Sequence, residues 1–103
     1  MIIYKDWRKY PIAINKYSLL PNKIYRSWLK NKKLVVLYNG KIIHFGDKRY
    51  TNYGIHTNKE RLKNYLKRSA NIRDSKGNLT KNNPYSANYW SRKILWNKNN
   101  VII

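Results

Sequence analysis

The clearest pattern in the chain is a pair of apolar runs separated by a turn dipeptide. Residues 33–38 and 41–45 are rich in β-branched and aliphatic side chains, and Asn39-Gly40 stands between them. Because Asn-Gly readily adopts the positive φ angles of a type I′ turn, the pattern predicts a β-hairpin over residues 33–45. Gly46 then ends the second strand.

A short amphipathic helix is predicted just before the hairpin, over about residues 21–31. Pro21 suits a first helical position because its missing N–H costs nothing there. The apolar residues of this segment follow a helical spacing and would share one side; they are Ile24, Tyr25, Trp28 and Leu29.

Two more helices are predicted after the hairpin. Thr57 and Glu60 match a capping box, so a helix should follow them to about Ala70. Ser86 can cap a final helix that carries several aromatic residues. The polar segment 71–84 between the two helices is expected to turn.

The expected fold class is α+β, with one small domain. A length of 103 residues allows a single domain. Residues 1–20 have the pattern of an extended basic and aromatic N-terminal arm, interrupted by Pro11. Residues 21–103 then form the small domain, in which the β-hairpin packs on two or three short helices. Its interior should be built from rings: Trp28, Phe45, Tyr65, Trp90 and Trp96.

The charge balance changes the picture most. The chain has 23 Lys and Arg residues against four carboxylates, which gives a formal net charge of +19. A compact protein of this mass exposes about 6,000 Å², so roughly one uncompensated charge falls on every 300 Å². Such a surface attracts polyanions. Because 42% of the residues are hydrophobic, the chain is expected to fold rather than to act as a disordered basic tail.

Catalytic and metal chemistry has few candidate residues. The four carboxylates are scattered, and Glu60 is explained by the helix cap, so a paired acid/base site is not expected. His44 and His56 with Asp47 could bind a metal, but two structural histidines explain the pattern better. The chain contains no cysteine. We therefore expect no enzyme, no cofactor and no small-molecule substrate.

The sequence does not predict a signal peptide or a membrane span. The first residues lack the apolar core of a signal peptide, and no segment approaches the length of a membrane span. A membrane-spanning protein is therefore not expected.

Nucleic-acid binding explains the basic residues better, because they alternate with aromatic and amide side chains. The clearest group follows one side of the predicted helix after residue 57. The candidate phosphate-binding residues are Lys48, Arg49, Lys59, Lys63, Lys67, Arg68, Arg73, Arg92 and Lys93. No helix-turn-helix, zinc-finger or RNA-recognition motif is present, so binding should not depend on base sequence.

From about Ile43 to Trp96 the chain resembles a family of short basic proteins of nucleocytoplasmic large DNA viruses, including mimivirus-like and algal viruses. The segments that carry the resemblance are His44-Phe45-Gly46, Tyr50-Thr51-Asn52-Tyr53 with His56, Lys59 through Tyr65 with Arg68, and Asn83-Pro84-Tyr85-Ser86-Ala87-Asn88-Tyr89-Trp90-Ser91-Arg92 with Leu95-Trp96. The resemblance implies a shared fold and a viral setting, in the virion or in the viral factory of the host cytoplasm.

Two functions remain open at this point. One is a virion-associated, sequence-independent nucleic-acid-binding protein, with DNA favoured over RNA. The other is a structural component of a large assembly, a minor capsid protein or a ribosomal-type protein, that folds against the acidic protein surfaces of its neighbours.

Overall fold

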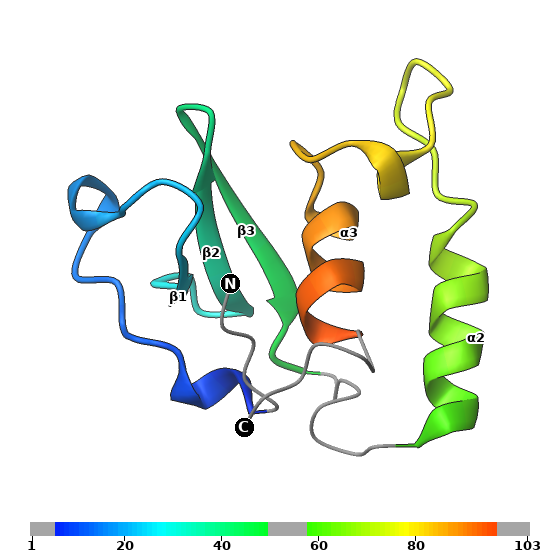
Figure 1. Ribbon diagram of the computed structural model, residues 1–103, viewed down its shortest axis with the longest axis horizontal. Helices are drawn as coiled ribbons and strands as arrows, with labels where there is room; N and C mark the ends of the chain where they lie inside the picture. Colours follow the sequence, from blue (N-terminus) through cyan, green and yellow to red (C-terminus); the bar gives the residue numbers. More distant parts are fainter. Residues whose placement is uncertain (1–5, 50–57, 97–103) are drawn as a thin grey trace.

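The computed structural model describes residues 6–49 and 58–96. They form a single α+β domain, as the sequence predicts. Its three-stranded antiparallel sheet has the order β1 (Ile24–Arg26), β2 (Lys32–Tyr38) and β3 (Lys41–Asp47), and both α-helices of these residues lie on one side of it. Figure 1 shows the layers: the N-terminal segment, the sheet, α3 (Ala87–Trp90) and, outermost, α2 (Lys59–Ser69). None of the helices in these residues has the length and apolar character that a membrane crossing requires.

The predicted hairpin is confirmed. It consists of β2 (Lys32–Tyr38) and β3 (Lys41–Asp47), with Tyr38 opposite Lys41 and Lys32 opposite Asp47. At the turn Asn39 has a φ of 46° and Gly40 a φ of 78°, which are the positive angles that the Asn-Gly dipeptide supplies. The turn therefore fixes the register of the two strands.

The helix predicted over residues 21–31 is wrong, because a third strand, β1 (Ile24–Arg26), lies there and pairs with β2. Ile24 and Tyr25 are adjacent in the sequence but are buried on opposite faces of the sheet. Successive side chains of a strand point to opposite faces, so an apolar pair suits a strand that is covered on both sides. Trp28, predicted in the core, is 41% exposed.

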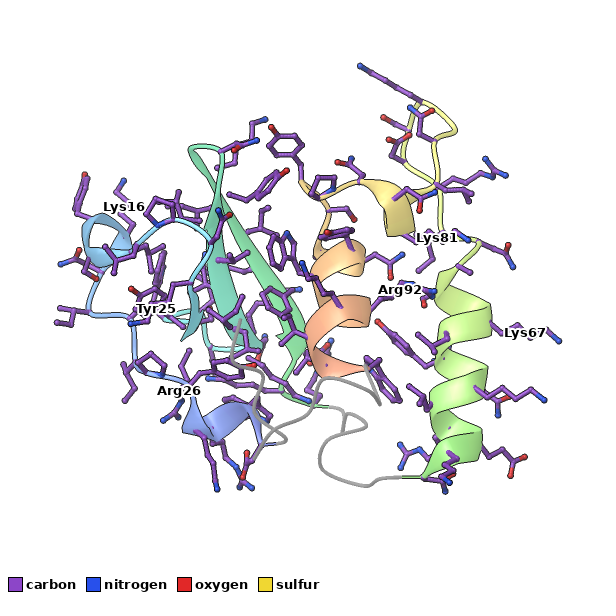
Figure 2. All side chains as sticks on the ribbon, viewed as in Figure 1. Lys16, Tyr25, Arg26, Lys67, Lys81 and Arg92 are labelled. Atoms are coloured by element: carbon purple, nitrogen blue, oxygen red, sulfur yellow. The ribbon has the colours of Figure 1, made fainter. Side chains whose placement is uncertain are left out.

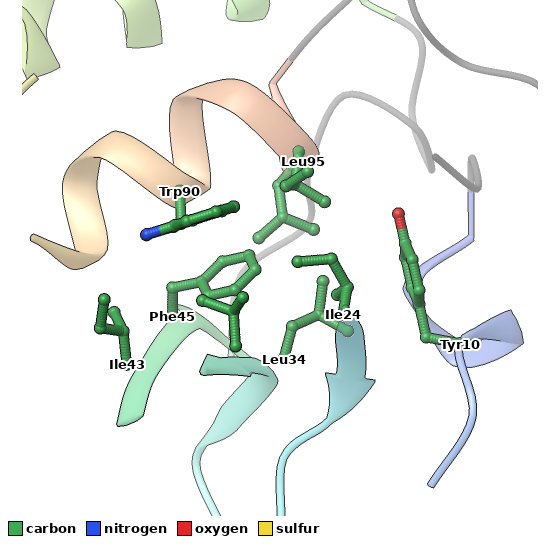
Figure 3. Packing of buried hydrophobic residues seen from close by; sticks show 9 residues of the cluster. Tyr10, Ile24, Leu34, Ile43, Phe45, Trp90 and Leu95 are labelled. Carbon is green, nitrogen blue, oxygen red and sulfur yellow. The ribbon is translucent and has the colours of Figure 1, made fainter. Parts of the chain in front are cut away.

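The main hydrophobic core lies between one face of the sheet and α3 with its π-helical extension Ser91–Leu95 (Figure 3). Phe45 and Trp90 are almost fully buried, as the sequence predicts, and the Trp90 indole N–H donates to the Pro84 carbonyl at 2.7 Å. The buried members of this cluster are Tyr10, Ile24, Leu34, Val36, Ile43, Phe45, Trp90, Ile94 and Leu95.

A second, smaller core covers the opposite face of the sheet. It contains Ala13, Leu19, Tyr25 and Val35. The Arg26 amide donates to the Pro11 carbonyl at 2.7 Å, and the Leu20 amide donates to the Tyr25 hydroxyl at 3.2 Å. The described part of the expected arm, residues 6–20, therefore packs against the sheet: Ala13 and Leu19 cover this face, and Tyr10 belongs to the main core on the other face.

The helix ends confirm one predicted cap and correct the other. Ser86 caps α3 by accepting a hydrogen bond from the Asn88 amide at 3.1 Å. The cap of α2 is Asn58, which accepts from the amides of Glu60 and Arg61, and not Thr57, which lies outside the described residues. Asn is as good an N-cap as Thr because its side-chain oxygen reaches the same amides.

Gly46 provides a test of the close packing between β3 and the π-helical segment Ser91–Leu95. It has a φ of +80°, and a Cβ there would lie 2.6 Å from Leu95 Cδ1; Gly77 has a φ of +84° with open space around it. Alanine costs about 1–2 kcal/mol at either position for the left-handed conformation. Because crowding of Leu95 adds to this, we expect Gly46→Ala to lower the free energy of unfolding by at least about 1 kcal/mol more than Gly77→Ala. Urea denaturation of the two variants measures the difference, and equal losses would contradict the close packing.

Candidate nucleic-acid interface

The four carboxylates neutralise little of the positive charge. Asp6 pairs with Arg8 and Asp47 pairs with Arg49, each at 2.7 Å. The hydrogen bonds from Arg49 lower the pKa of Asp47 to about 2. Asp74 instead holds a turn by accepting from the amides two and four residues later. Most of the cations therefore lie without an acidic partner on the surface that the structure describes.

One side of α2 carries the predicted row of lysines. Lys59, Lys63 and Lys67 are exposed and, at 3.6 residues per turn, lie within a sector of about 80°; we call them the lysine flank. Leu62 and Ser69 are buried on the inner side of the same helix. Figure 2 shows Lys67 pointing away from the rest of the molecule. The lysine flank is therefore presented to solvent.

The other side of α2 carries Arg61 and Arg68, which we call the arginine flank. The two residues lie within about 20° of each other around the helix and about 150° from the centre of the lysine flank. Sequence reasoning placed Arg68 with the lysines as one group. The helix geometry separates them, so that α2 presents two basic surfaces with different surroundings.

The remaining predicted residues are spread over the molecule. Lys48 lies near the Trp7 ring, 5.9 Å from its centroid, and Lys93 lies near the rings of Tyr89 and Trp90. Arg73 donates to the Gly77 carbonyl at 2.7 Å. The structure does not bring these three residues together with the lysine flank.

Arg92 has a structural role that the sequence did not suggest. Its Nη1 atom donates to the Leu66 carbonyl and to Ser69 Oγ, both at 2.6 Å. The Arg92 side chain therefore connects the π-helical segment after α3 to α2 (Figure 2). Asn88 adds a hydrogen bond to the Ser69 carbonyl at 2.9 Å. A cation at the last carbonyls of a helix also interacts favourably with the helix dipole. These contacts hold the carboxyl end of α2 against α3.

A cleft of about 530 Å³ lies where the arginine flank meets the sheet and α3. We call it the basic cleft; its lining includes Lys32, Lys33, Gly46, Asp47, Arg61, Asn64, Tyr65, Arg68, Ser91 and Trp96. Tyr65 and Trp96 stack face to face along it, with ring centroids 4.1 Å apart. Four cationic side chains thus share one concave surface with a single carboxylate.

Lys33 differs from the other cations because it is only 3% exposed. Burial lowers the pKa of its amine to about 8, although nearby Asp47 opposes the shift. Its Nζ lies 6.0 Å from the centroid of the Trp7 ring, and Arg26 lies 5.6 Å from the same ring. Lys48 lies near this ring as well, so that three cations surround the indole of Trp7 at this end of the sheet.

Sequence reasoning missed Lys32, Lys33 and Arg61 as candidate site residues. A signal was available for the first two, because the Asn39-Gly40 turn fixes a register in which Lys32 faces Asp47. For Arg61 the helical spacing showed a second basic side of α2, but not what lies opposite it.

His44 is a half-buried side chain on β3. Its Nδ1 lies 2.8 Å from Ser27 Oγ, and Trp28 packs edge-on against the imidazole. Burial lowers the pKa of His44 from its usual 6.5, and nearby Lys32 lowers it further. Residues 6–49 and 58–96 contain no group of three His, Cys, Asp or Glu side chains that could hold a metal ion, and His56 lies outside them.

Comparison with known proteins connects the chain to a family over part of its length. A family of unknown function (DUF5754) matches residues 22–69, which span the sheet and α2. The match covers a little under half of the 103 residues. No curated protein and no solved structure matches the chain. The chain is therefore similar to this family over the segment that carries both flanks of α2.

His44 predicts a dependence of stability on pH. Because its pKa in the folded chain lies below the unfolded value near 6.5, its contribution to stability is complete above pH 6.5 and is lost as the pH falls below it. We expect a lower Tm at about pH 5.5 than at about pH 7.5. The difference should shrink in His44→Asn, which does not titrate and carries an amide that is able to hydrogen-bond with Ser27. Thermal unfolding followed by circular dichroism measures both, and an unchanged difference in the variant would rule out His44 as the cause.

Proposed function

We propose that this protein is a non-enzymatic, sequence-independent DNA-binding protein of a large DNA virus, associated with the virion or the viral factory. The observation that carries the binding role is the lysine flank, three exposed cations in one row on α2. The viral setting depends on the resemblance described above, with its segments His44-Phe45-Gly46 and Asn83 through Arg92.

The spacing of the lysine flank suits a phosphate backbone. Four residues of helix advance about 6 Å, so the three lysines cover about 12 Å along one line. Lys59, Lys63 and Lys67 repel one another at this spacing, and each repulsion costs a few tenths of a kcal/mol in an isolated helix. A polyanion that lies along the flank removes this cost. Contacts of this kind position a protein on DNA without reading its bases.

Charge reversal on the flank tests the proposal. We expect Lys63→Glu with Lys67→Glu to weaken the binding of duplex DNA equally for all base sequences. If both residues contact phosphates, the slope of log affinity against log salt should fall in magnitude by about 2. Fluorescence anisotropy with labelled duplexes of different sequence, measured over a range of salt concentrations, gives both quantities.

A matched control separates this surface from net charge. Lys16→Glu with Lys23→Glu changes the charge equally, and Lys16 lies at the opposite edge of the molecule from Lys67 (Figure 2). We expect a smaller loss of affinity in the control. Equal losses in the two variants would show that α2 is not the binding surface.

A second candidate function is supported by exposed apolar side chains on the N-terminal segment. Ile14 and Tyr17 are each 85% exposed, and Ile12 and Leu20 are also well exposed. They lie on the segment that covers the sheet, so their own side chains are not needed for the core. An exposed apolar patch with a polar rim is typical of a protein–protein interface. Lys16 and Lys23 beside it would favour an acidic neighbour, as expected of an assembly component.

Purified protein, freed of nucleic acid by nuclease and high salt, distinguishes the two candidates. An assembly component should self-associate or aggregate, and Ile14→Ser with Tyr17→Ser should reduce this because it removes apolar surface. A binding module should be monomeric with or without these changes. Size-exclusion chromatography with light scattering measures the state, and a monomeric parent protein would count against the second candidate.

A further inference from the structure

The basic cleft is a second basic site, distinct in shape from the lysine flank. The flank lies on the convex outer side of α2, whereas the cleft is concave and is lined by β2, β3, α2 and the π-helical segment after α3. Its volume of about 530 Å³ is within the range of about 300–1,000 Å³ that is typical of sites for small ligands. A DNA duplex is too wide for such a cavity, but a single nucleotide or a strand end is not.

The charges in the cleft favour an anion with more than one negative charge. Lys32 and Lys33 come from the start of β2, and Arg61 and Arg68 from the arginine flank. Asp47 is the one carboxylate in the described lining, and Arg49 already binds it in a paired geometry. Four cationic side chains and one carboxylate give the described part of the lining a net positive charge, and a positive potential in a concave site favours an anion with more than one negative charge.

The groups in the lining also fit a phosphate and an attached base. A guanidinium can donate two parallel hydrogen bonds to a phosphate, and a lysine adds a compact charge. Asn64 can add an amide donor. The stacked pair of Tyr65 and Trp96 forms an aromatic wall beside these cations, and aromatic rings are the usual partners of unpaired bases.

We infer that the basic cleft binds a phosphomonoester dianion attached to a nucleoside. This chemistry is shared by a free nucleoside 5′-monophosphate and by the 5′-phosphorylated end of a nucleic-acid strand. The inference extends the proposed function, on which it depends for nucleic acid as the source of the ligand. It adds a site for strand ends to the sites for internal phosphates on the lysine flank.

The first experiment uses ligands that differ in one group. Binding of deoxyadenosine 5′-monophosphate and of deoxyadenosine is measured by isothermal titration calorimetry. Short single strands that carry either a 5′-phosphate or a 5′-hydroxyl are compared in the same way. We expect each phosphorylated ligand to bind about tenfold or more tightly than its partner without the phosphate. A preference seen only for the strands identifies a strand end as the ligand, and a preference in both pairs identifies the nucleotide itself.

The second experiment uses two variants of the same helix with the same change in charge. Arg61→Gln with Arg68→Gln alters the cleft, and Lys63→Gln with Lys67→Gln alters the lysine flank. We expect the cleft variant to lose the preference for the 5′-phosphate and to keep most of its affinity for duplex DNA with 5′-hydroxyl ends. The flank variant should show the opposite pattern. Amide chemical shifts of the parent protein with the nucleotide should change at Lys32, Lys33 and the arginine flank.

The phosphomonoester site and the proposed DNA-binding function would be contradicted by different results. If the parent protein binds duplex DNA but shows no preference for a 5′-phosphate, or if both variants reduce that preference equally, the cleft is not a phosphomonoester site. If the parent protein binds no duplex DNA, the proposed function fails; binding of the nucleotide alone would then leave the cleft as a nucleotide site. Circular dichroism of both variants confirms that α2 remains folded.

Discussion

The rest of the fold depends on the burial of β2 from both sides. Leu34, Val35 and Val36 are fully buried, and their side chains point alternately to the two faces of the sheet. Each such residue contributes about 1.5–3 kcal/mol when it is removed from water. A sheet of three strands cannot provide this burial by itself, so each face needs a cover. Ala13 and Leu19 of the N-terminal segment cover one face, and α3 with its π-helical extension covers the other together with Tyr10.

This arrangement explains where the charges lie. Since α3 occupies one apolar face of the sheet, α2 lies outside it as a further layer and is held by side chains such as Arg92, Asn88 and the Tyr65–Trp96 stack. A helix in that position needs only a narrow apolar side, and the rest of its surface is open to Lys and Arg. Among the cations of residues 6–49 and 58–96, Lys33 is the buried exception, because it lies at the end of the doubly covered strand. Its burial disfavours the charged form of the amine and lowers its pKa to about 8.

The parts of the fold that were predictable from the sequence depend on local chemistry. Asn39-Gly40 specifies its turn with two residues, and Ser86 caps α3 within three residues. The strand at Ile24 and Tyr25 was missed because their spacing also fits a helix, and only the presence of covers on both faces decides between the two. Those covers are formed by residues distant in the sequence, such as Leu19 and Trp90.

The candidate site also has one part that the sequence predicts and one part that depends on tertiary structure. The lysine flank follows from the period of one helix, so its row was visible in the sequence. The basic cleft requires the relative placement of β2, α2 and α3, which is set by Arg92 and by the packing of Leu95 against Gly46. No spacing in the sequence contains that information. Arg92 itself was expected to contact phosphate, and its contacts with Leu66 and Ser69 depend equally on tertiary structure.

The attachment of α2 by a few side chains has a consequence for the dynamics of the protein. Arg92 and Asn88 contact only the last turn of the helix, and the backbone hydrogen bonds of α2 form within the helix and not with the sheet. Such an element can open as a unit while the doubly covered sheet stays folded, because local unfolding follows the boundaries of weakly packed segments. A polyanion bound to α2 would shift this opening equilibrium toward the closed helix by mass action. A helix attached mainly by side chains is thus also one whose order a bound polyanion would increase.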